Sequence, residues 1–252
     1  MHRFYIDQLL KEGEICTLSD TDSHHAVHVL RLAPGAEVQL MDGQSRYRGF
    51  LRAMTPEVTV EVGQQLPSTE PRLQIHLYQG LPKGDKMEMI VQKAVELGVA
   101  AVVPMAMARC VVKLSDKDGA RKQERWQRIA IEAGKQSGRC RQLAVAPPLP
   151  FARMVKELAG RHDAVTVPWE DAKSKGPASF AAAHPDIRSL GVLIGPEGGI
   201  SPEEMEQLKS AGAVPMTLGP RILRTETAGM AVVAALMCLY GEMEGTGDDG
   251  AP

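Results

Sequence analysis

The chain has 252 residues, 44% hydrophobic and 24% charged, a composition typical of a globular protein with room for one large domain or two small ones. The formal net charge of −2 gives no overall signal for nucleic acid, so any such contact must come from local basic patches. The four cysteines form no Cys-x-x-Cys pair and no secretory leader is recognisable, so we expect reduced thiols and a cytoplasmic location. The longest apolar run, over 228–240, is shorter than the roughly 20 residues that a bilayer requires, so no membrane partner is expected.

Residues 1–70 predict a small, mostly β domain that fits a compact barrel. A short helix is predicted over 24–32, and Asp42-Gly43 is a hairpin signal between the first two strand-like runs after it. Those strand-like runs are Glu37–Met41, Tyr47–Ala53 and Val58–Val62. Residues 65–72 contain two prolines and no periodicity, and we therefore interpret them as a linker.

Residues 73–245 alternate between strand-like and helix-like runs, which indicates βα units and a mostly parallel sheet. The predicted strands are 73–79, 101–105, 143–146, 164–167, 190–194 and 214–218. The predicted helices are 85–97, 119–138, one that begins at the capping box Ser201-Pro202-Glu203-Glu204, and the apolar run 228–240. Residues 246–252 are polar and Gly-rich, and we expect a frayed tail.

Two of these strands run into a Gly-Pro step. The first step opens the stretch Gly195–Gly199, and the second opens Gly219–Arg224. Because ligands bind where the strands of an open α/β sheet end, we expect one ligand site formed by both stretches. The first stretch lacks the Lys and Ser/Thr of a P-loop and the spacing of a dinucleotide fingerprint, but its bare main-chain groups suit the edge of an adenine. A tight turn before a helix is the alternative, which the second stretch disfavours.

The second stretch leads into the apolar helix. Arg221 and Arg224 bracket the apolar pair Ile222-Leu223, which places two cations beside an apolar surface. Thr225 or Thr227 is predicted to cap the helix that follows. Glu226 lies one step into that helix, where an acidic residue is also an ordinary partner of the helix dipole.

Basic residues gather in the predicted helix 119–138 and just after it, and about half of their charge is explained by glutamates within the helix. The exit Gln136-Ser137-Gly138-Arg139 places a cation at the end of the helix, where the helix dipole favours one. A second group of basic and aromatic residues lies in His2–Tyr5 and His24–Arg31, where it can hold phosphate and stack on bases. These histidines lack Cys or carboxylate ligands at suitable spacing, so no metal is expected.

Several segments together resemble the RsmE family. They are "MHRFYID", "HHAVHVLRLAPGAEVQLMDG", "LPKGDKMEMIVQKAVELGV", "ERWQRIAIEAGKQSGR", "LIGPEGGISPEE" and "LGPRILRTETA", of which the last two are the most specific. The resemblance implies a SPOUT-type α/β domain with a C-terminal trefoil knot and a small N-terminal PUA-like β-barrel. It also implies a homodimer that uses S-adenosylmethionine to methylate N3 of a uridine in the decoding region of 16S rRNA, within the assembled small ribosomal subunit. Val95 and Gly134-Lys135 depart from the family's pattern.

The resemblance also implies site residues at matching positions. Candidate cofactor contacts are Val167, Leu193, Gly195, Pro196, Glu197, Gly198, Leu218, Gly219, Ile222, Leu223, Thr225 and Ala228. Candidate catalytic residues are Arg139, Arg224 and Glu226, the arginines for a uridine anion and the carboxylate for its proton. Candidate RNA contacts are Arg3, His25, Arg31, Lys135, Arg139 and Arg141.

Two other functions remain open. A ribose 2′-O-methyltransferase would share the SPOUT fold and the cofactor, although the stretch 218–228 matches the uridine-N3 family. A non-enzymatic RNA-binding assembly factor would bind RNA but not S-adenosylmethionine.

Overall fold

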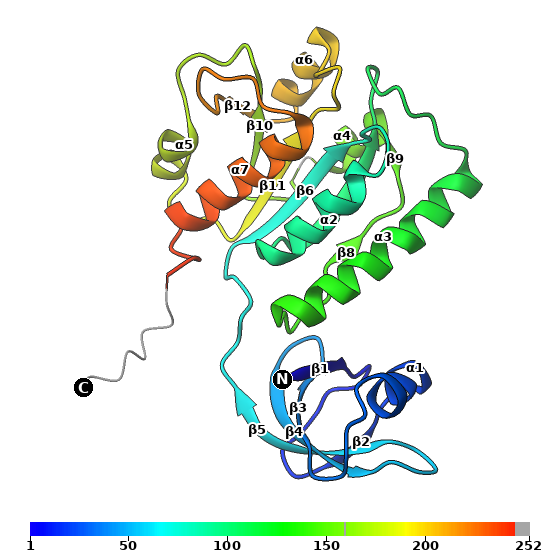
Figure 1. The fold of residues 1–252 in the computed structure, drawn as a ribbon. Coiled ribbons are helices and arrows are strands. Elements are labelled where there is room, and N and C mark those ends of the chain that lie inside the picture. Colours follow the sequence, from blue (N-terminus) through cyan, green and yellow to red (C-terminus); the bar gives the residue numbers. More distant parts are fainter. Residues whose placement is uncertain (159, 245–252) are drawn as a thin grey trace. The chain divides into compact units, whose positions relative to one another are not determined.

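The computed structural model describes residues 1–158 and 160–244, and the chain divides into two compact units (Figure 1). The first unit comprises Met1–Glu70 with Ile131–Gln142, and the second comprises Pro71–Ala130 with Leu143–Pro252. The first unit therefore includes a segment from the middle of the chain. The predicted tail at 246–252 lies outside the described residues.

The first unit is built on a five-stranded sheet in the order β1-β3-β4-β5-β2. Its strands are β1 (His2–Tyr5), β2 (Ile15–Thr17), β3 (Glu37–Met41), β4 (Arg46–Ala53) and β5 (Thr59–Leu66). Strands β1 and β3 are parallel and the other pairs antiparallel, with β1 and β2 at the two edges. The Asp42 carboxylate accepts hydrogen bonds from the main-chain N–H groups of Gln44 and Ser45, which confirms the predicted hairpin turn.

Two predictions for this unit need correction. Gln65 and Leu66 belong to β5 rather than to a linker, because their main chain continues the pairing with Tyr47 and Arg46. The predicted helix 24–32 begins earlier, as α1 (Asp20–His24), and continues as a π-helical turn η1 (His25–Val29). It begins earlier because the Ser19 side chain caps it by accepting the N–H of Asp22.

The second unit contains a seven-stranded sheet in the order β12-β10-β11-β6-β7-β8, with β9 paired to β7. The strands are β6 (Gln74–Gly80), β7 (Ala101–Ala106), β8 (Ala144–Val145), β9 (Leu149–Pro150), β10 (Ala164–Pro168), β11 (Ser189–Ile194) and β12 (Val214–Met216). Every pair is parallel, which confirms the α/β class. All carboxyl ends of these strands therefore point to one edge of the sheet.

The helices of this α/β part are α2 (Lys86–Glu96), α4 (Phe151–Leu158), α5 (Pro177–Ala183), α6 (Pro202–Ser210) and α7 (Thr225–Leu239). Helix α3 (Asp116–Ser137) begins in this unit, and its residues from Ile131 onward belong to the first. The predicted capping box of α6 is present, since Ser201 and Glu204 exchange hydrogen bonds with each other's main chain. Helices α4 and α5 were not predicted. They have only 8 and 7 residues, too few for a clear helical period.

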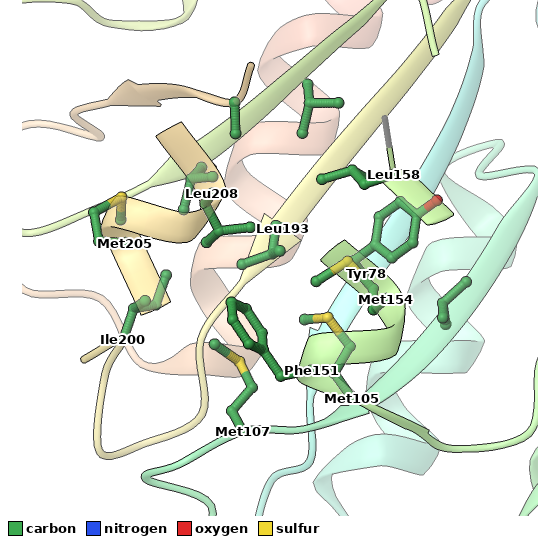
Figure 2. Packing of buried hydrophobic residues seen from close by; sticks show 14 residues of the cluster. Tyr78, Met105, Met107, Phe151, Met154, Leu158, Leu193, Ile200, Met205 and Leu208 are labelled. Carbon is green, nitrogen blue, oxygen red and sulfur yellow. The ribbon is translucent and has the colours of Figure 1, made fainter. Parts of the chain in front are cut away.

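The sheet is covered on both faces. On one face, α4 and α6 pack into an apolar cluster with Tyr78, Met105 and Leu193 (Figure 2). On the other face lies α7, which buries Val232, Val233, Leu236 and Met237, so much of the apolar run at 228–240 is covered within the chain. Within 1–158 and 160–244, no helix combines the length and apolar character that a membrane span requires.

Candidate active site

The two Gly-Pro stretches meet at the carboxyl edge of the parallel sheet, as predicted. Gly195 follows β11 and the stretch 219–224 follows β12, with only β10 between these two strands. The hydroxyl of Thr225 donates a hydrogen bond of 2.6 Å to the carbonyl oxygen of Gly195. The two loops are thus joined directly, which produces a site at the end of the strands, where open α/β sheets bind ligands.

The loop Gly195–Gly199 is packed so closely that side chains are excluded. A Cβ on Gly195 would lie 2.8 Å from Ile200, and one on Gly198 would lie 2.9 Å from the carbonyl oxygen of Arg109. A Cβ on the neighbouring Gly80, at the end of β6, would lie 2.6 Å from the nitrogen of Pro196. Real Cβ atoms do not approach other atoms this closely, so glycine is required at these positions for packing as well as for any ligand.

The stretch 218–224 is more open. Gly219 has a φ of +95°, in the region that favours glycine, and no atom lies within 4 Å of the position of a Cβ. Ile222 is 84% exposed, whereas Leu218, Leu223 and Ala228 are half-buried. An apolar side chain this exposed has no partner among the described residues of its own chain, so it is available to a ligand or to another molecule.

Val167 and Leu193 are placed differently from the loop residues. Both side chains are fully buried in the apolar cluster to which α4 and α6 contribute. Leu193 is labelled in Figure 2. Any contact that they make with a cofactor must therefore use the main chain at the ends of β10 and β11.

The first turn of α7 differs from its prediction. The helix begins at Thr225 with Arg224 as its N-cap residue, and no side chain makes a capping hydrogen bond. The predicted cap by Thr225 or Thr227 is wrong, because the Thr225 hydroxyl is used by Gly195 and Thr227 lies within the first turn. Arg224 is exposed beside this corner.

A lysine that was not predicted as a site residue links two candidate carboxylates. Lys86, in the first turn of α2, places its Nζ 2.9 Å from Glu197 Oε1 and 3.3 Å from Glu226 Oε2. Glu197 Oε1 also accepts the N–H of Lys83 at 3.0 Å. Three segments from different parts of the chain therefore converge on one charged group.

The pKa values of this group favour the charged forms. The hydrogen bond to Glu197 raises the pKa of Lys86 above its usual value, and partial loss of hydration opposes this. Partial burial raises the pKa of Glu197, but the hydrogen bonds from Lys86 and from main-chain N–H groups outweigh it and hold this pKa below its usual range. The carboxylate and the ammonium thus stay ionised around neutral pH.

Two buried acceptor atoms at this edge accept no hydrogen bond of standard geometry. Among the described residues, the buried side-chain nitrogen and oxygen atoms without a hydrogen bond are Gln79 Oε1, Glu226 Oε2 and His76 Nδ1. Gln79 and Glu226 both lie beside Thr225, and Lys86 Nζ lies 3.3 Å from Glu226 Oε2. Glu226 Oε2 is thus compensated by the charge of Lys86, and Gln79 Oε1 faces Gly229 on α7, where a Cβ would lie 3.6 Å away.

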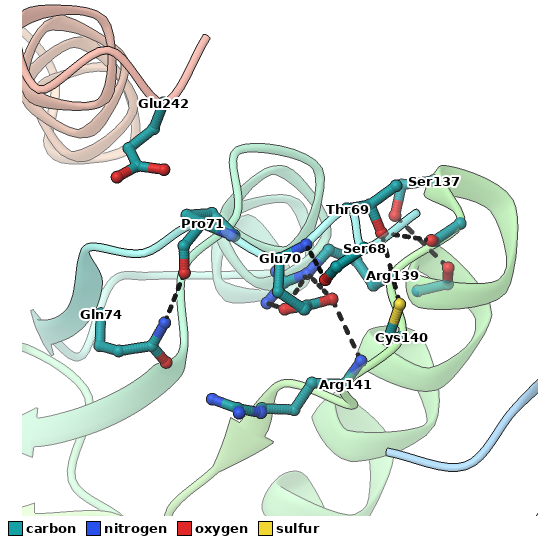
Figure 3. Close-up of polar contacts among 12 residues, drawn as sticks. Ser68, Thr69, Glu70, Pro71, Gln74, Ser137, Arg139, Cys140, Arg141 and Glu242 are labelled. Carbon is teal, nitrogen blue, oxygen red and sulfur yellow. Dashed lines mark hydrogen bonds and ion pairs between the residues drawn. The ribbon is translucent and has the colours of Figure 1, made fainter. Parts of the chain in front are cut away.

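In the first unit, Arg139 is buried rather than exposed. Its guanidinium forms a bidentate pair with Glu70, with nitrogen–oxygen distances of 2.6 to 3.0 Å, and the two side chains are 5% and 11% exposed (Figure 3). The main-chain N–H of Arg141 also donates to Glu70, and the Tyr5 hydroxyl donates to the Arg139 carbonyl oxygen. Burial raises the pKa of Tyr5, which keeps this hydroxyl protonated.

Two other predicted RNA contacts are occupied in the same unit. The Arg3 guanidinium donates to the carbonyl oxygens of Lys135 and Gln136, which satisfies the end of α3. Lys135 Nζ lies 2.7 Å from the Asp22 carboxylate. The three remaining candidates are exposed, namely His25, Arg31 and Arg141.

The departure at Gly134 has a packing reason. A Cβ at this position would lie 2.4 Å from the hydroxyl oxygen of Tyr5, so the alanine expected from the family's pattern does not fit beside this tyrosine. Gly134 therefore makes room for the hydroxyl group that binds Arg139.

Sequence reasoning missed Gln79 and Lys86. Gln79 is completely buried, and a polar residue in a strand carries no local signal that it will be. Lys86 belongs to the segment "LPKGDKMEM", which supported the resemblance without indicating a role. In the described parts of the chain, no group of three or more His, Cys, Asp or Glu side chains is arranged to hold a metal ion.

Comparison with known proteins defines the class. Residues 69–237 match the model of an RNA methyltransferase domain, and residues 18–62 match that of an RNA methyltransferase PUA domain. The α/β unit with its site at the carboxyl edge and the small β unit before it are thus those of a PUA-containing RNA methyltransferase.

The full-length relatives identify the family. The chain is 34% identical to the ribosomal RNA small subunit methyltransferase E of Bacillus subtilis, with 94% of this chain and 96% of that protein covered. It is 33% identical to the protein of the same name from Mycobacterium bovis, over 98% and 95% of the two chains. The crystal structure of ribosomal RNA small subunit methyltransferase E from Neisseria gonorrhoeae, bound to S-adenosylmethionine, superposes with a TM-score of 0.85 at 32% identity, over 95% and 98%. The chain belongs to the RsmE family.

Proposed function

We propose that this protein transfers a methyl group from S-adenosylmethionine to N3 of a uridine in the 16S rRNA of the small ribosomal subunit. The observation that carries the proposal is the hydrogen-bonded junction of the two Gly-Pro loops at the carboxyl edge of the sheet, in a chain of the RsmE family. A family member with 32% identity and nearly full coverage binds the same cofactor.

The residues at this edge fit S-adenosylmethionine. The cofactor carries a sulfonium, an ammonium and the N–H groups of adenine, and the edge offers the carboxylates of Glu197 and Glu226 beside bare main-chain groups. The main-chain groups of Gly195–Gly199, of 218–228 and of the loop after β10 would hold it. When bound, the cofactor supplies a methyl group that is already activated, so the protein provides orientation and electrostatics.

The protein's own side chains would prepare the uridine. N3 of a uracil carries a proton, so the nucleophile is the deprotonated ring, whose negative charge spreads onto the carbonyl oxygens. An arginine near these oxygens stabilises that charge as an oxyanion donor does. Arg224 is the candidate at the second unit's site, Arg139 is the candidate in the first unit, and Glu226 is the candidate proton acceptor.

RNA would be held mainly by the first unit. His25, Arg31 and Arg141 are exposed there, whereas Arg3 and Lys135 are half-buried and Arg139 is buried. We therefore propose that RNA affinity depends first on the three exposed side chains. A PUA-type domain in a methyltransferase chain supports this division of labour.

Further parts of the proposal come from the family. We propose that the loops after β10, β11 and β12 form a trefoil knot, that the protein works as a homodimer in the cytoplasm, and that its substrate is the assembled small subunit. Methylation of naked 16S rRNA and of purified small subunits, compared under the same conditions, tests the last point. Faster methylation of the naked RNA contradicts it.

The position of the methyl group separates this function from ribose 2′-O-methylation. The RNA is methylated with labelled cofactor, cleaved in alkali and analysed by mass spectrometry. A base methyl leaves alkaline cleavage intact and appears on a uridine, whereas a ribose methyl blocks cleavage at its own nucleotide and would refute uridine-N3 methylation.

Calorimetry with S-adenosylmethionine alone separates an enzyme from a non-enzymatic assembly factor. We expect saturable binding of the cofactor without RNA. RNA binding without any cofactor binding would support the assembly factor instead.

A further inference from the structure

Gln79 is a fully buried amide at the cofactor edge. It lies next to the end of β6, its exposed fraction is 0%, and its strand is central in the parallel sheet. Burying an amide costs free energy unless its polar atoms are hydrogen-bonded. The contacts of this side chain therefore indicate why a glutamine occupies a position where an aliphatic residue would pack.

The Gln79 amide belongs to a chain of hydrogen bonds that crosses three segments. Its Nε2 donates to Thr225 Oγ1 at 2.8 Å and to the carbonyl oxygen of Gly80 at 3.0 Å. Thr225 Oγ1 in turn donates to the carbonyl oxygen of Gly195 at 2.6 Å. The chain thus runs from β6 through the first turn of α7 to the Gly-Pro loop after β11.

The direction of these bonds is fixed by the number of protons. A threonine hydroxyl has one proton, and here it goes to Gly195, so the hydroxyl can only accept from Gln79. The opposite amide orientation would place an oxygen against the carbonyl of Gly80 and the lone pairs of Thr225. The amide nitrogen must therefore face Thr225. Oε1 faces Gly229, and a Cβ added to Gly229 would lie 3.6 Å from this oxygen.

We propose that Gln79 is a positioning residue for the methyl donor. By donating to Thr225, it fixes the hydroxyl in the orientation that holds Gly195, and so sets the spacing between the two loops of the site. This inference rests on the proposed use of S-adenosylmethionine. Gln79 acts through Thr225, so its removal should weaken cofactor binding even if the sheet remains intact.

A Gln79→Glu variant tests the donor directly. A protonated carboxylic acid can donate to Thr225, whereas a carboxylate cannot and instead draws the threonine proton away from Gly195. Burial raises the pKa of a carboxyl group, so both forms become accessible between pH 5 and 9. The measured quantity is the ratio of the variant's Kd for S-adenosylmethionine to the wild-type Kd. We expect this ratio to be close to one at pH 5 and about ten at pH 9, the scale of one lost hydrogen bond.

The ratio of the two Kd values reports the titration of the new carboxyl group alone. Charged groups close to this corner include Lys86 on α2, Glu197 after β11, and Arg224 and Glu226 at the start of α7. Both proteins contain all four, and both bind the same cofactor, so their titrations cancel in the ratio. Gln74→Glu is the matched control, because Gln74 lies at the other end of β6 and donates to the Pro71 carbonyl. Its ratio should stay near one at every pH.

A second pair of variants tests the same contact without a new charge. Thr225→Val keeps the shape but removes the hydroxyl, and should raise the Kd about tenfold at every pH. Thr225→Ser keeps the hydroxyl and should bind nearly as wild type does. Thermal melts with near-ultraviolet circular dichroism establish that each variant is folded.

The outcomes separate this inference from the proposed function. A wild type that does not bind S-adenosylmethionine refutes both together. A wild type that binds, with a pH-independent ratio for folded Gln79→Glu, overturns the positioning role alone. If Gln79→Glu does not fold, equal affinities of Thr225→Val and Thr225→Ser overturn it instead.

Discussion

Arg31 has a left-handed backbone, with a φ of +52°, at the end of the π-helical turn. The N–H of Leu32 reaches back to the carbonyl oxygen of Ala26, a helix ending in which glycine is the usual residue at the left-handed position. An arginine at this position lowers the free energy of unfolding relative to glycine. Because strained residues are retained where they serve a function, the strain supports the proposed role of Arg31 in RNA binding.

We expect Arg31→Gly to gain stability and lose RNA affinity. The free energy of unfolding should rise by up to about 1 kcal/mol because the strain is removed. RNA binding should weaken, and the slope of log affinity against log salt concentration should become shallower by the amount expected for about one lost phosphate contact. Arg31→Lys, which keeps both charge and strain, is the control. Unchanged RNA affinity and salt dependence in Arg31→Gly would show that Arg31 does not contact phosphate.

Arg139 poses the question of whether a buried ion pair also takes part in chemistry. Arg139→Ala leaves the Glu70 carboxylate buried and unpaired, which should cost about 3–5 kcal/mol of stability. If Arg139 stabilises the uridine anion, single-turnover methyl transfer should fall about two orders of magnitude further than in Glu70→Ala. Higher pH should partly rescue Arg139→Ala by supplying more deprotonated uridine. Equal losses in the two folded variants would assign Arg139 to structure alone.

At the level of elements, His162 joins three strands at the amino edge of the parallel sheet. It precedes β10, its Nε2 lies 2.8 Å from the Tyr78 hydroxyl on β6, and its Nδ1 lies 2.7 Å from the Ser189 hydroxyl on β11. Burial, together with His76 and Arg161 nearby, lowers the pKa of His162 to about 4. The folded protein therefore holds this ring neutral where the unfolded chain would protonate it.

This shift predicts a loss of stability in acid. The folded pKa lies below the unfolded value near 6.5, so stability is complete above that pH and is lost as the pH falls towards 4. The loss should be on the order of 2–3 kcal/mol. Denaturant unfolding of wild type and His162→Gln between pH 4 and 8 measures it, and the variant should show the smaller slope. Equal slopes for wild type and variant would contradict the assignment to His162. Burial also lowers the pKa of His76, so His76 accounts for acid sensitivity that remains in the variant.

At the level of the whole molecule, α7 is covered only in part by its own chain. Leu239 at its end is 47% exposed and Met243 after it is 55% exposed. We predict a homodimer at micromolar concentration by light scattering, and Leu239→Lys should shift it towards monomer, since a buried ammonium opposes an apolar contact. Ile15→Lys, at an exposed apolar position of the first unit, is the control. A monomeric wild type would contradict the prediction.

Several features of this protein could be predicted from the sequence because they depend on neighbours along the chain. Alternating strand and helix patterns gave the α/β class, and the Gly-Pro steps after two strands placed two loops at one edge, since parallel strands end together. The Asp42-Gly43 turn and the Ser201 capping box have local signatures and are both present. Strands β1 and β2, with 4 and 3 residues, and helices α4 and α5 are too short to carry a period.

Tertiary structure decided which polar groups meet, because such pairings join residues far apart in sequence. Arg139 finds Glu70, 69 positions away, and Gln79 finds Thr225, 146 positions away. No local pattern in either member of these pairs indicates its partner. The sequence predicted Arg139 as a residue that faces RNA or the reacting base, and not as a buried partner of Glu70. The sequence by itself determined the class, the family resemblance and the edge that holds the site. Burial and pairing of individual side chains were decided only in three dimensions, since they depend on the packing of every segment around them.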